Sequence, residues 1–416
     1  MKTGYSNMRC GLIGRKLSHS FSKPIHNALC DYDFAMCELE PDELEDFVKN
    51  GPLDAFCITI PYKKDVIPFL DEISPTAQTI GAVNTVVRKN GKLYGYNTDY
   101  FGFEYTVRRS GVSIEGKKVL VFGRGGAAAT VCAYLNDVNA SEVICLGSAD
   151  NTPENLALHS DAEIIINASP VGMYPNNDSS PAPLGIFPKC EAVFDLIYNP
   201  ANTRIMLEAK EKGIVAQNGL NMLVSQAARA FELFTSDTYE DGIIERIVSD
   251  ISFNSLNLVL VGMPSCGKST VGAIAAGILG RDFIDSDTEF EKQHGITPAN
   301  AIKTLGEEKF RLMETETLSA LGKLRGKVIA TGGGAVTQER NYPLLKQNGV
   351  IIFLERDLDK LSAKGRPISQ STSIEELYVK RKDAYCRFAD ITVKSTEVKE
   401  NTASLIVEAF KNHFKG

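Results

Sequence analysis

Short apolar segments alternate with segments of helical periodicity along the whole chain of 416 residues. RCGLIG at 9–14, AFCITI at 55–60 and VLVFG at 119–123 are apolar and contain β-branched residues, which is typical of buried strands. By contrast, NGLNMLVSQAARAFELF at 218–234 repeats apolar residues at the spacing of one helix face. This alternation predicts an α/β protein whose sheets contain parallel strands.

The pattern divides the chain into three sections. Residues 1–112 hold several predicted strands, and residues 113–217 begin with a strand, a glycine-rich turn and a helix. Residues 254–416 begin with another strand and a second, different glycine-rich loop. Because a chain of this length fits two or three domains, we expect each section to form a domain.

Composition and charge narrow the class of protein. The hydrophobic fraction of 43% and the charged fraction of 23% are those of ordinary soluble domains. A net charge of −7 argues against a dedicated nucleic-acid binder. The nine cysteines form no CxxC pair, which favours a reduced, cytoplasmic protein. We expect no signal peptide and no membrane segment, while the oligomeric state stays open.

A phosphate-binding motif opens the third section. GMPSCGKST at 262–270 fits G-x4-G-K-[ST] and lies between the apolar segment LNLVLVG and the helix-forming segment STVGAIAAGIL. Backbone N–H groups in this setting can surround phosphate oxygens, the lysine can neutralise the β and γ phosphates, and the serine can hold Mg²⁺. The residues predicted to bind ATP are Gly262, Ser265, Cys266, Gly267, Lys268, Ser269 and Thr270.

Further motifs narrow the choice among P-loop proteins. DSD at 285–287 follows a short predicted strand, so one carboxylate can join the metal shell and the other can orient a hydroxyl group. FRLME at 310–314 and RKDAY at 381–385 supply arginines, TGGG at 331–334 ends a predicted strand, and GRP at 365–367 lies in a predicted loop. Together these motifs resemble shikimate kinase over the section from Leu256 to the end.

The resemblance to shikimate kinase implies a P-loop domain with a parallel sheet and a set of roles. Asp287 would orient the substrate hydroxyl or act as its base, with Lys268 at the phosphates. Asp285 and Ser269 would hold Mg²⁺, and Arg366 would approach the transferred phosphoryl group on a lid. The residues expected to contact the substrate carboxylate and ring are Arg311, Arg381, Gly332, Gly333 and Gly334.

The first section carries polar motifs after its predicted strands. SFS at 20–22, TIPYK at 59–63, GAVNT at 81–85 and NTD at 97–99 occur in this order, and INASPVGMYP and FDLIYNP follow later. These motifs resemble shikimate dehydrogenase from about residue 9 to about residue 234. The resemblance implies an α/β substrate domain at 1–112 completed by helices at 218–250, and a Rossmann-like NADP-binding domain at 113–217.

The same resemblance implies the residues of the first active site. Lys63 and Asp99 would be the catalytic pair, with protonated Lys63 donating to the ketone oxygen and Asp99 orienting the amine. The predicted substrate contacts are Ser20, Ser22, Thr59, Asn84, Tyr198 and Gln226. Two hydroxyl groups in one loop, such as those of the serines, can hydrogen-bond a substrate carboxylate.

A glycine turn in the second section predicts a dinucleotide site. Gly123-x-Gly125-x-x-Ala128 stands between a predicted strand and a predicted helix, as in a Rossmann turn. The residues expected to contact the cofactor are Gly123, Arg124, Gly125, Gly126 and Ala127. The next strand, in ICLGSAD at 144–150, ends with neither a basic nor an acidic residue. We therefore expect Arg124 to meet the 2′-phosphate of NADP.

These motifs lead to one hypothesis and two alternatives. The hypothesis is a bifunctional enzyme that reduces 3-dehydroshikimate with NADPH and then phosphorylates shikimate with ATP and Mg²⁺. In the first alternative, the N-terminal half only senses dehydroshikimate and is joined to a working kinase. In the second, the substrates are quinate-like or the kinase acts on another small acid.

Overall fold

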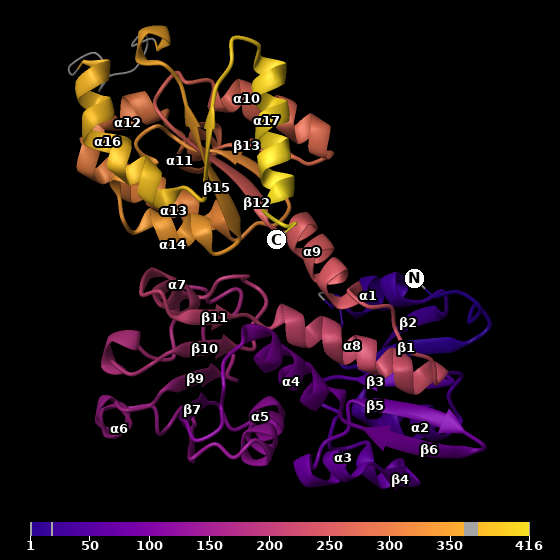
Figure 1. The fold of residues 1–416 in the computed structure, drawn as a ribbon. Helices are drawn as coiled ribbons and strands as arrows, with labels where there is room; N and C mark the ends of the chain where they lie inside the picture. Colours follow the sequence, from indigo (N-terminus) through magenta and orange to yellow (C-terminus); the bar gives the residue numbers. More distant parts are fainter. Residues whose placement is uncertain (1, 18–19, 362–372, 416) are drawn as a thin grey trace. The chain divides into compact units, whose positions relative to one another are not determined.

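A computed structural model describes residues 2–17, 20–361 and 373–415 (Figure 1). The chain divides into two compact units, one made of Met1–Tyr198 and Ile205–Val248 and the other of Asn199–Arg204 and Ser249–Gly416. The division after Val248 falls inside helix α9 (Ile243–Ser255). The predicted start of the third section, at residue 254, also lies inside this helix, so the domain limits stay a prediction.

The first unit contains a mixed sheet with the strand order β2-β1-β3-β5-β6-β4. The pairs β1–β2, β1–β3 and β4–β6 are parallel, whereas β3–β5 and β5–β6 are antiparallel. The strands are β1 (Arg9–Gly14), β2 (Asp33–Glu38), β3 (Ala55–Ile58), β4 (Glu72–Ile73), β5 (Thr85–Lys89) and β6 (Lys92–Tyr96). All residues of β3 are buried, so this central strand can carry a polar loop into the interior at its end.

A second sheet of the first unit is entirely parallel, with the order β11-β10-β9-β7-β8. The strands are β7 (Lys118–Phe122), β8 (Glu142–Leu146), β9 (Ile164–Asn167), β10 (Ala192–Asp195) and β11 (Val215–Gln217). β9 and β10 are buried at every position, because helices or loops cover both faces of a parallel sheet. The predicted strand, turn and helix of a dinucleotide domain are thus present.

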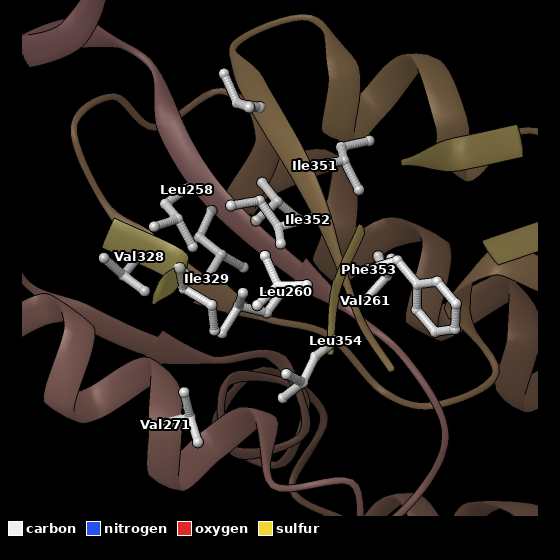
Figure 2. Close-up of a cluster of buried hydrophobic side chains, with 14 of the residues drawn as sticks. Leu258, Leu260, Val261, Val271, Val328, Ile329, Ile351, Ile352, Phe353 and Leu354 are labelled. Atoms are coloured by element: carbon white, nitrogen blue, oxygen red, sulfur yellow. The ribbon is translucent and has the colours of Figure 1, made fainter. Parts of the chain in front are cut away.

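The second unit is built on a parallel sheet with the order β13-β14-β12-β15-β16. The strands are β12 (Asn257–Val261), β13 (Phe283–Asp285), β14 (Val328–Ala330), β15 (Gly349–Glu355) and β16 (Ile391–Lys394). Figure 2 shows apolar side chains of β12, β14 and β15 packed into one buried cluster, among them Leu260, Ile329 and Phe353. This core fixes the strand ends at which the phosphate loop and the glycine triplet begin.

Helices cover these sheets. Those of the first unit are α1 (Ser22–Leu29), α2 (Leu44–Asn50), α3 (Pro75–Ile80), α4 (Thr98–Ser110), α5 (Gly126–Asp137), α6 (Pro153–Leu158), α7 (Arg204–Glu211) and α8 (Leu220–Thr235). Those of the second unit are α10 (Lys268–Leu279), α11 (Ser286–His294), α12 (Pro298–Leu305), α13 (Glu307–Gly322), α14 (Asn341–Lys346), α16 (Ile374–Phe388) and α17 (Lys399–Asn412). α10 and α17 pack side by side (Figure 1).

The most extensive helix packing in the first unit joins α4 to α8. α4 begins after Asn97, whose side chain accepts a hydrogen bond from the backbone N–H of Tyr100. Gly102 faces α8, and a Cβ atom at this position would lie 2.7 Å from the carbonyl oxygen of Met222 and 3.1 Å from Cβ of Gln226. Glycine therefore allows two helices that carry predicted site residues to approach closely.

We expect Gly102→Ala to destabilise the first unit. The added methyl group meets backbone atoms of α8 that cannot move without shifting the helix, and overpacking of this kind costs about 1–3 kcal/mol. Differential scanning calorimetry should show a lower melting temperature for the transition of this unit.

Gly185→Ala is the matched control, because a Cβ atom there meets no atom within 4 Å. It should melt within a degree or so of the wild type or slightly above it, since alanine restricts the unfolded chain. Equal melting temperatures for the two variants would show that α4 and α8 are not tightly packed at Gly102.

Candidate active sites

A lysine–aspartate pair lies beyond the end of β3. The chain leaves β3 at Ile58 and passes the cis peptide bond between Ile60 and Pro61 before it reaches Lys63. Nζ of Lys63 lies 2.6 Å from Oδ2 of Asp99 in the first turn of α4, and the side chains are 28% and 16% exposed. The two residues predicted to form the catalytic pair are in contact and remain accessible to a small molecule.

Asn84 fixes the start of α4 next to this pair. Its Oδ1 accepts a hydrogen bond from the backbone N–H of Thr98 at 2.7 Å, and its Nδ2 donates to Oγ1 of Thr98 at 3.0 Å. Oγ1 of Thr98 also lies 3.2 Å from Oε1 of Gln226 on α8. Two predicted substrate contacts, Asn84 and Gln226, therefore meet at the residue that precedes Asp99.

The predicted serine pair lies at the start of α1. The backbone N–H of Ser22 donates to Oγ of Ser20 at 3.1 Å, and the two hydroxyl oxygens are 3.0 Å apart. Phe21, between them, packs edge-on against Tyr198 with ring centres 5.8 Å apart. The two serines thus form a second polar group in the first unit, and Tyr198 contacts the phenylalanine between them.

Buried neutral side chains connect α1 to β3. The predicted substrate contact Thr59 directly follows this strand. Nε2 of His26 on α1 lies 3.8 Å from Sγ of Cys57 on β3, and its Nδ1 lies 2.6 Å from the hydroxyl of Tyr32. Burial lowers the pKa of His26 to about 3. Burial also raises the pKa of Cys57 to about 12, with the negative charge of Asp99 acting in the same direction. These contacts anchor the serine-bearing helix beside the lysine–aspartate region without adding charge.

The glycine turn between β7 and α5 has the backbone of an anion site. Gly123 has φ of 124°, and a Cβ atom there would lie 2.7 Å from the carbonyl oxygen of Ala168. Gly125 precedes α5, Gly126 begins it, and no atom lies within 4 Å of a Cβ at either position. The first N–H groups of a helix, here including Ala127, lack intrahelical partners and favour a phosphate.

An acidic residue does reach the end of β8, contrary to our prediction. Asp150 lies in the turn after the strand, and its Oδ2 accepts a hydrogen bond from the backbone N–H of Gly147 at 3.2 Å. The same oxygen lies 2.7 Å from Nη2 of Arg124, which also donates to the carbonyl of Cys145 at 3.3 Å. Arg124 is therefore not a lone cation in this turn but half of an ion pair.

The P-loop of the second unit holds its lysine inside the loop. Gly262 and Gly267 have φ of 153° and 102°, and Ser265 has φ of 64°, so the backbone curves in the manner of an anion-binding nest. Lys268 begins α10 and is 7% exposed, and its Nζ donates to the carbonyls of Gly262 and Met263 at 2.8 and 2.9 Å. Its Nζ also lies 3.7 Å from Sγ of Cys266.

Two oxygen atoms that could bind a metal ion lie together, one on the P-loop helix and one at the end of β13. Oγ of Ser269, which precedes the exposed Thr270, donates to Oδ2 of Asp285 at 2.5 Å, and Oδ1 of Asp285 caps α11 by accepting from the N–H of Asp287 at 2.9 Å. No cluster of three or more His, Cys, Asp or Glu side chains suited to a metal occurs in the described residues. Mg²⁺ needs only one or two protein oxygens beside phosphate and water, so the pair fits it.

Two carboxylates face the glycine triplet after β14. A Cβ atom on Gly332 would lie 3.0 Å from Oδ1 of Asp287 and 2.8 Å from Oε1 of Glu314. Burial raises the pKa of Glu314, against the positive charge of Arg311, and Asp287 adds a further raising effect. The bare backbone of Gly332 is thus required by the approach of these groups.

Two arginines of the second unit contact the same triplet. Nη1 of Arg311, which is 5% exposed, donates to Glu314 at 2.7 Å, and its Nε is buried with no hydrogen-bond partner among the described residues. A Cβ atom on Gly334 would collide with the Arg311 guanidinium. Nη1 of Arg381 donates to the carbonyl of Gly333 at 3.2 Å. The predicted substrate-binding arginines therefore converge, and one keeps a spare donor.

Comparison with known proteins identifies the N-terminal part first. The family model described as shikimate dehydrogenase substrate binding domain matches residues 12–86. The shikimate dehydrogenase (NADP(+)) of Clostridium perfringens (strain 13 / Type A) is 35% identical over 264 residues, which cover 58% of this chain and 97% of that protein. The chain belongs to the shikimate dehydrogenase family.

Solved structures agree with this family. A chorismate mutase/shikimate 5-dehydrogenase fusion protein from Clostridium acetobutylicum has a TM-score of 0.55 and 33% identity, with coverage of 59% of this chain and 97% of that one. A shikimate 5-dehydrogenase from Thermus thermophilus, in complex with NADP(H) and shikimate, has a TM-score of 0.53 and 30% identity. The match covers 58% of this chain and 99% of that one. The predicted α/β fold of the dehydrogenase part is confirmed.

The C-terminal part carries a shikimate kinase domain. The family model for shikimate kinase matches residues 264–411, which include the P-loop from Pro264 onwards, DSD, the glycine triplet and Arg381. Both predicted resemblances are therefore confirmed, and the chain is an enzyme with a dehydrogenase part and a kinase part. No helix in the described ranges is long and apolar enough to cross a membrane.

The sequence analysis missed one candidate residue, and one predicted residue lies outside the part of the chain that the structure describes. Arg366, predicted for the kinase lid, is outside the described residues. Arg356, directly after β15, was missed: its Nη1 would lie 3.8 Å from a Cβ on Gly267, and its Nε is buried without a partner in the described chain. Because β15 pairs with β12, the position of Arg356 at that strand end was the available signal.

Proposed function

We propose that this chain catalyses two successive reactions, the NADPH-dependent reduction of 3-dehydroshikimate to shikimate and the ATP-dependent phosphorylation of the shikimate 3-hydroxyl. One observation carries the proposal: a half-buried Lys63–Asp99 pair and a P-loop beside buried arginines occur in a single chain. The product of the first reaction is the substrate of the second. Relatives named shikimate dehydrogenase (NADP(+)) and the shikimate kinase family support the two kinds of reaction.

In the reduction, the Lys63–Asp99 pair supplies the proton. When bound, the nicotinamide cofactor supplies the hydride to the ketone carbon. Lys63 donates a proton to the ketone oxygen, and Asp99, 2.6 Å from Nζ, orients the ammonium group. Ser20 and Ser22 hydrogen-bond the substrate carboxylate, while Thr59, Asn84, Tyr198 and Gln226 contact its remaining polar groups.

In the phosphorylation, the kinase residues position groups and neutralise charge. Asp287 holds the substrate hydroxyl and accepts its proton. Lys268 leaves the carbonyls of its own loop to contact the β and γ phosphates, and Ser269 with Asp285 holds Mg²⁺, which screens the phosphate charge when bound. Glu314 and Asp287 both face Gly332, so Arg311, which pairs with Glu314, offsets the second negative charge beside the proposed proton acceptor.

The carboxylate of the substrate is bound by the converging arginines. The spare Nε of Arg311 and the guanidinium of Arg381 lie next to the glycine triplet, whose bare backbone leaves room for a ring. Arginine donors suit a carboxylate because they can form two parallel hydrogen bonds. A buried donor without a partner is costly, so a bound carboxylate stabilises this arrangement.

Single substitutions should separate the two activities. Lys63→Ala should lower the kcat of dehydroshikimate reduction by about 100-fold or more, since general acid catalysis contributes about 10²–10⁴, and leave shikimate phosphorylation unchanged. Asp287→Ala should have the converse effect. Spectrophotometric NADPH oxidation and coupled ADP release measure the two rates.

Neighbouring residues of the same charge serve as controls. Lys64→Ala and Glu291→Ala change exposed residues beside the two sites and should keep both activities near the wild-type level. Loss of both activities from Lys63→Ala or from Asp287→Ala in a folded protein would contradict the assignment of each residue to one reaction.

Cofactor selectivity should depend on the Arg124–Asp150 pair. Arginine favours the 2′-phosphate of NADP, whereas an acidic residue after the second strand favours the free hydroxyls of NAD. We expect Arg124→Ala to lower kcat/KM for NADPH by about 10-fold or more and to spare NADH, because a lost charged contact of about 1.4 kcal/mol is tenfold. Asp150→Asn should shift the ratio toward NADPH.

The calorimetric transition of the first unit reports whether each variant is folded there. Equal use of NADPH and NADH in the wild type, unchanged by either substitution, would exclude the pair from cofactor recognition.

A further inference from the structure

Two cysteines are in contact next to the glycine turn between β7 and α5. Cys132 lies on α5 and Cys145 on β8, and their sulfur atoms are only 3.0 Å apart. This separation is about 1 Å longer than a disulfide bond, for which S–S is about 2.05 Å. All nine cysteines are free thiols, and no other two sulfur atoms in the described part of the chain make such a contact.

The surroundings favour reaction at Cys145. With the Cys132 thiol as the donor, its hydrogen bond lowers the pKa of Cys145 against the effect of burial, and the positive charge of Arg124 acts in the same direction. Both cysteines are partly exposed, whereas Cys10, Cys30, Cys57, Cys190 and Cys266 are buried. A thiolate with solvent access and a second thiol beside it is the arrangement of redox-active cysteine pairs.

The pair also touches the proposed cofactor site. Arg124 in the glycine turn donates to the carbonyl oxygen of Cys145 and forms the ion pair with Asp150. Cys132 belongs to the helix that begins at Gly126, whose first N–H groups face the expected phosphates. A bond between the sulfurs would therefore join the two elements that flank the ribose and phosphate positions.

We propose that Cys132 and Cys145 form a reversible dithiol–disulfide pair that is oxidised by a hydroperoxide and that weakens dinucleotide binding when closed. The effect on binding rests on the proposed dehydrogenase function; the oxidation itself does not. Closing the pair shortens the sulfur separation by about 1 Å. This shift displaces α5 relative to β8 and disturbs the contacts of Arg124.

The chemistry balances with hydrogen peroxide as the oxidant. The Cys145 thiolate attacks one peroxide oxygen, the O–O bond breaks, and the departing hydroxide takes up a proton to form water. The sulfur of Cys132 then attacks the resulting sulfenic acid, so that the S–O bond breaks, the S–S bond forms, and the Cys132 proton leaves with the hydroxide as a second water. A dithiol reductant returns both thiols by exchange.

Peptide mapping tests the bond directly. The sequence contains no Lys or Arg between Arg124 and Lys189, so trypsin leaves both cysteines in one peptide, but cleavage before Asp137 separates them. After mild peroxide treatment of the full-length protein, the two aspartate-cleaved peptides should stay joined and should separate with dithiothreitol. The joined species should be absent in Cys132→Ser and Cys145→Ser and present in Cys386→Ser, which removes an exposed single cysteine.

Sulfinic acid at Cys145 without a joined peptide, or linkage of Cys145 to a different cysteine, would overturn the proposal. So would unmodified thiols at peroxide concentrations that oxidise Cys386.

Steady-state kinetics test whether closing the cysteine pair weakens NADPH binding. The oxidised wild type should show a KM for NADPH raised about 3-fold or more, reversed by dithiothreitol, because a loss of about 0.7 kcal/mol corresponds to that factor. Cys132→Ser and Cys132→Ala should not respond to peroxide, and a constant kinase rate in every sample would show that peroxide has not damaged the second unit. An unchanged KM in fully joined protein would refute the effect on binding. Absence of any reduction in untreated protein would instead refute the proposed dehydrogenase function and leave the mapping result intact.

Discussion

The chemistry of this chain depends on keeping charged groups out of bulk water while each retains a partner of opposite charge. An ion pair that loses one member in a buried place destabilises a protein by about 3–5 kcal/mol, so such groups have to arrive together. Lys63 meets Asp99 because the end of β3 and the start of α4 converge, and Arg311 meets Glu314 because the two residues lie on one face of α13. The first pair joins the segment after a strand to a helix, whereas both members of the second pair come from one helix.

The glycine turn after β7 and the P-loop after β12 differ in where their positive charge comes from. In the dehydrogenase part, Gly123 brings the turn against the backbone at Ala168, and charge enters only through Arg124 and its partner Asp150. In the kinase domain, the loop surrounds its own lysine, and we propose that this lysine supplies the charge that phosphoryl transfer requires. Joining the two parts keeps both activities in one molecule, but a tether does not raise the concentration of a small product that diffuses freely.

Sequence patterns predicted the strands and turns, and the motifs that follow them, because these are local. GMPSCGKST lies between a buried strand and a helix, so Lys268 and Ser269 could be placed from spacing alone. Asp150 could not be placed in this way, because its contact with Arg124 depends on how the turn after β8 folds back. Cys132 and Cys145 come together only through the packing of α5 on β8. Glu314 was visible in FRLME, yet its burial between Asp287 and Arg311 is a tertiary property.

The central claim is that one chain performs both successive reactions, and the most direct test supplies the purified full-length protein with 3-dehydroshikimate, NADPH, ATP and Mg²⁺ and follows both products by NMR spectroscopy. The account predicts that shikimate 3-phosphate accumulates, that omission of ATP stops the sequence at shikimate, and that omission of NADPH leaves dehydroshikimate unchanged. Phosphorylation of added shikimate without any conversion of 3-dehydroshikimate would contradict it, and would indicate a kinase joined to a module that binds dehydroshikimate without reducing it.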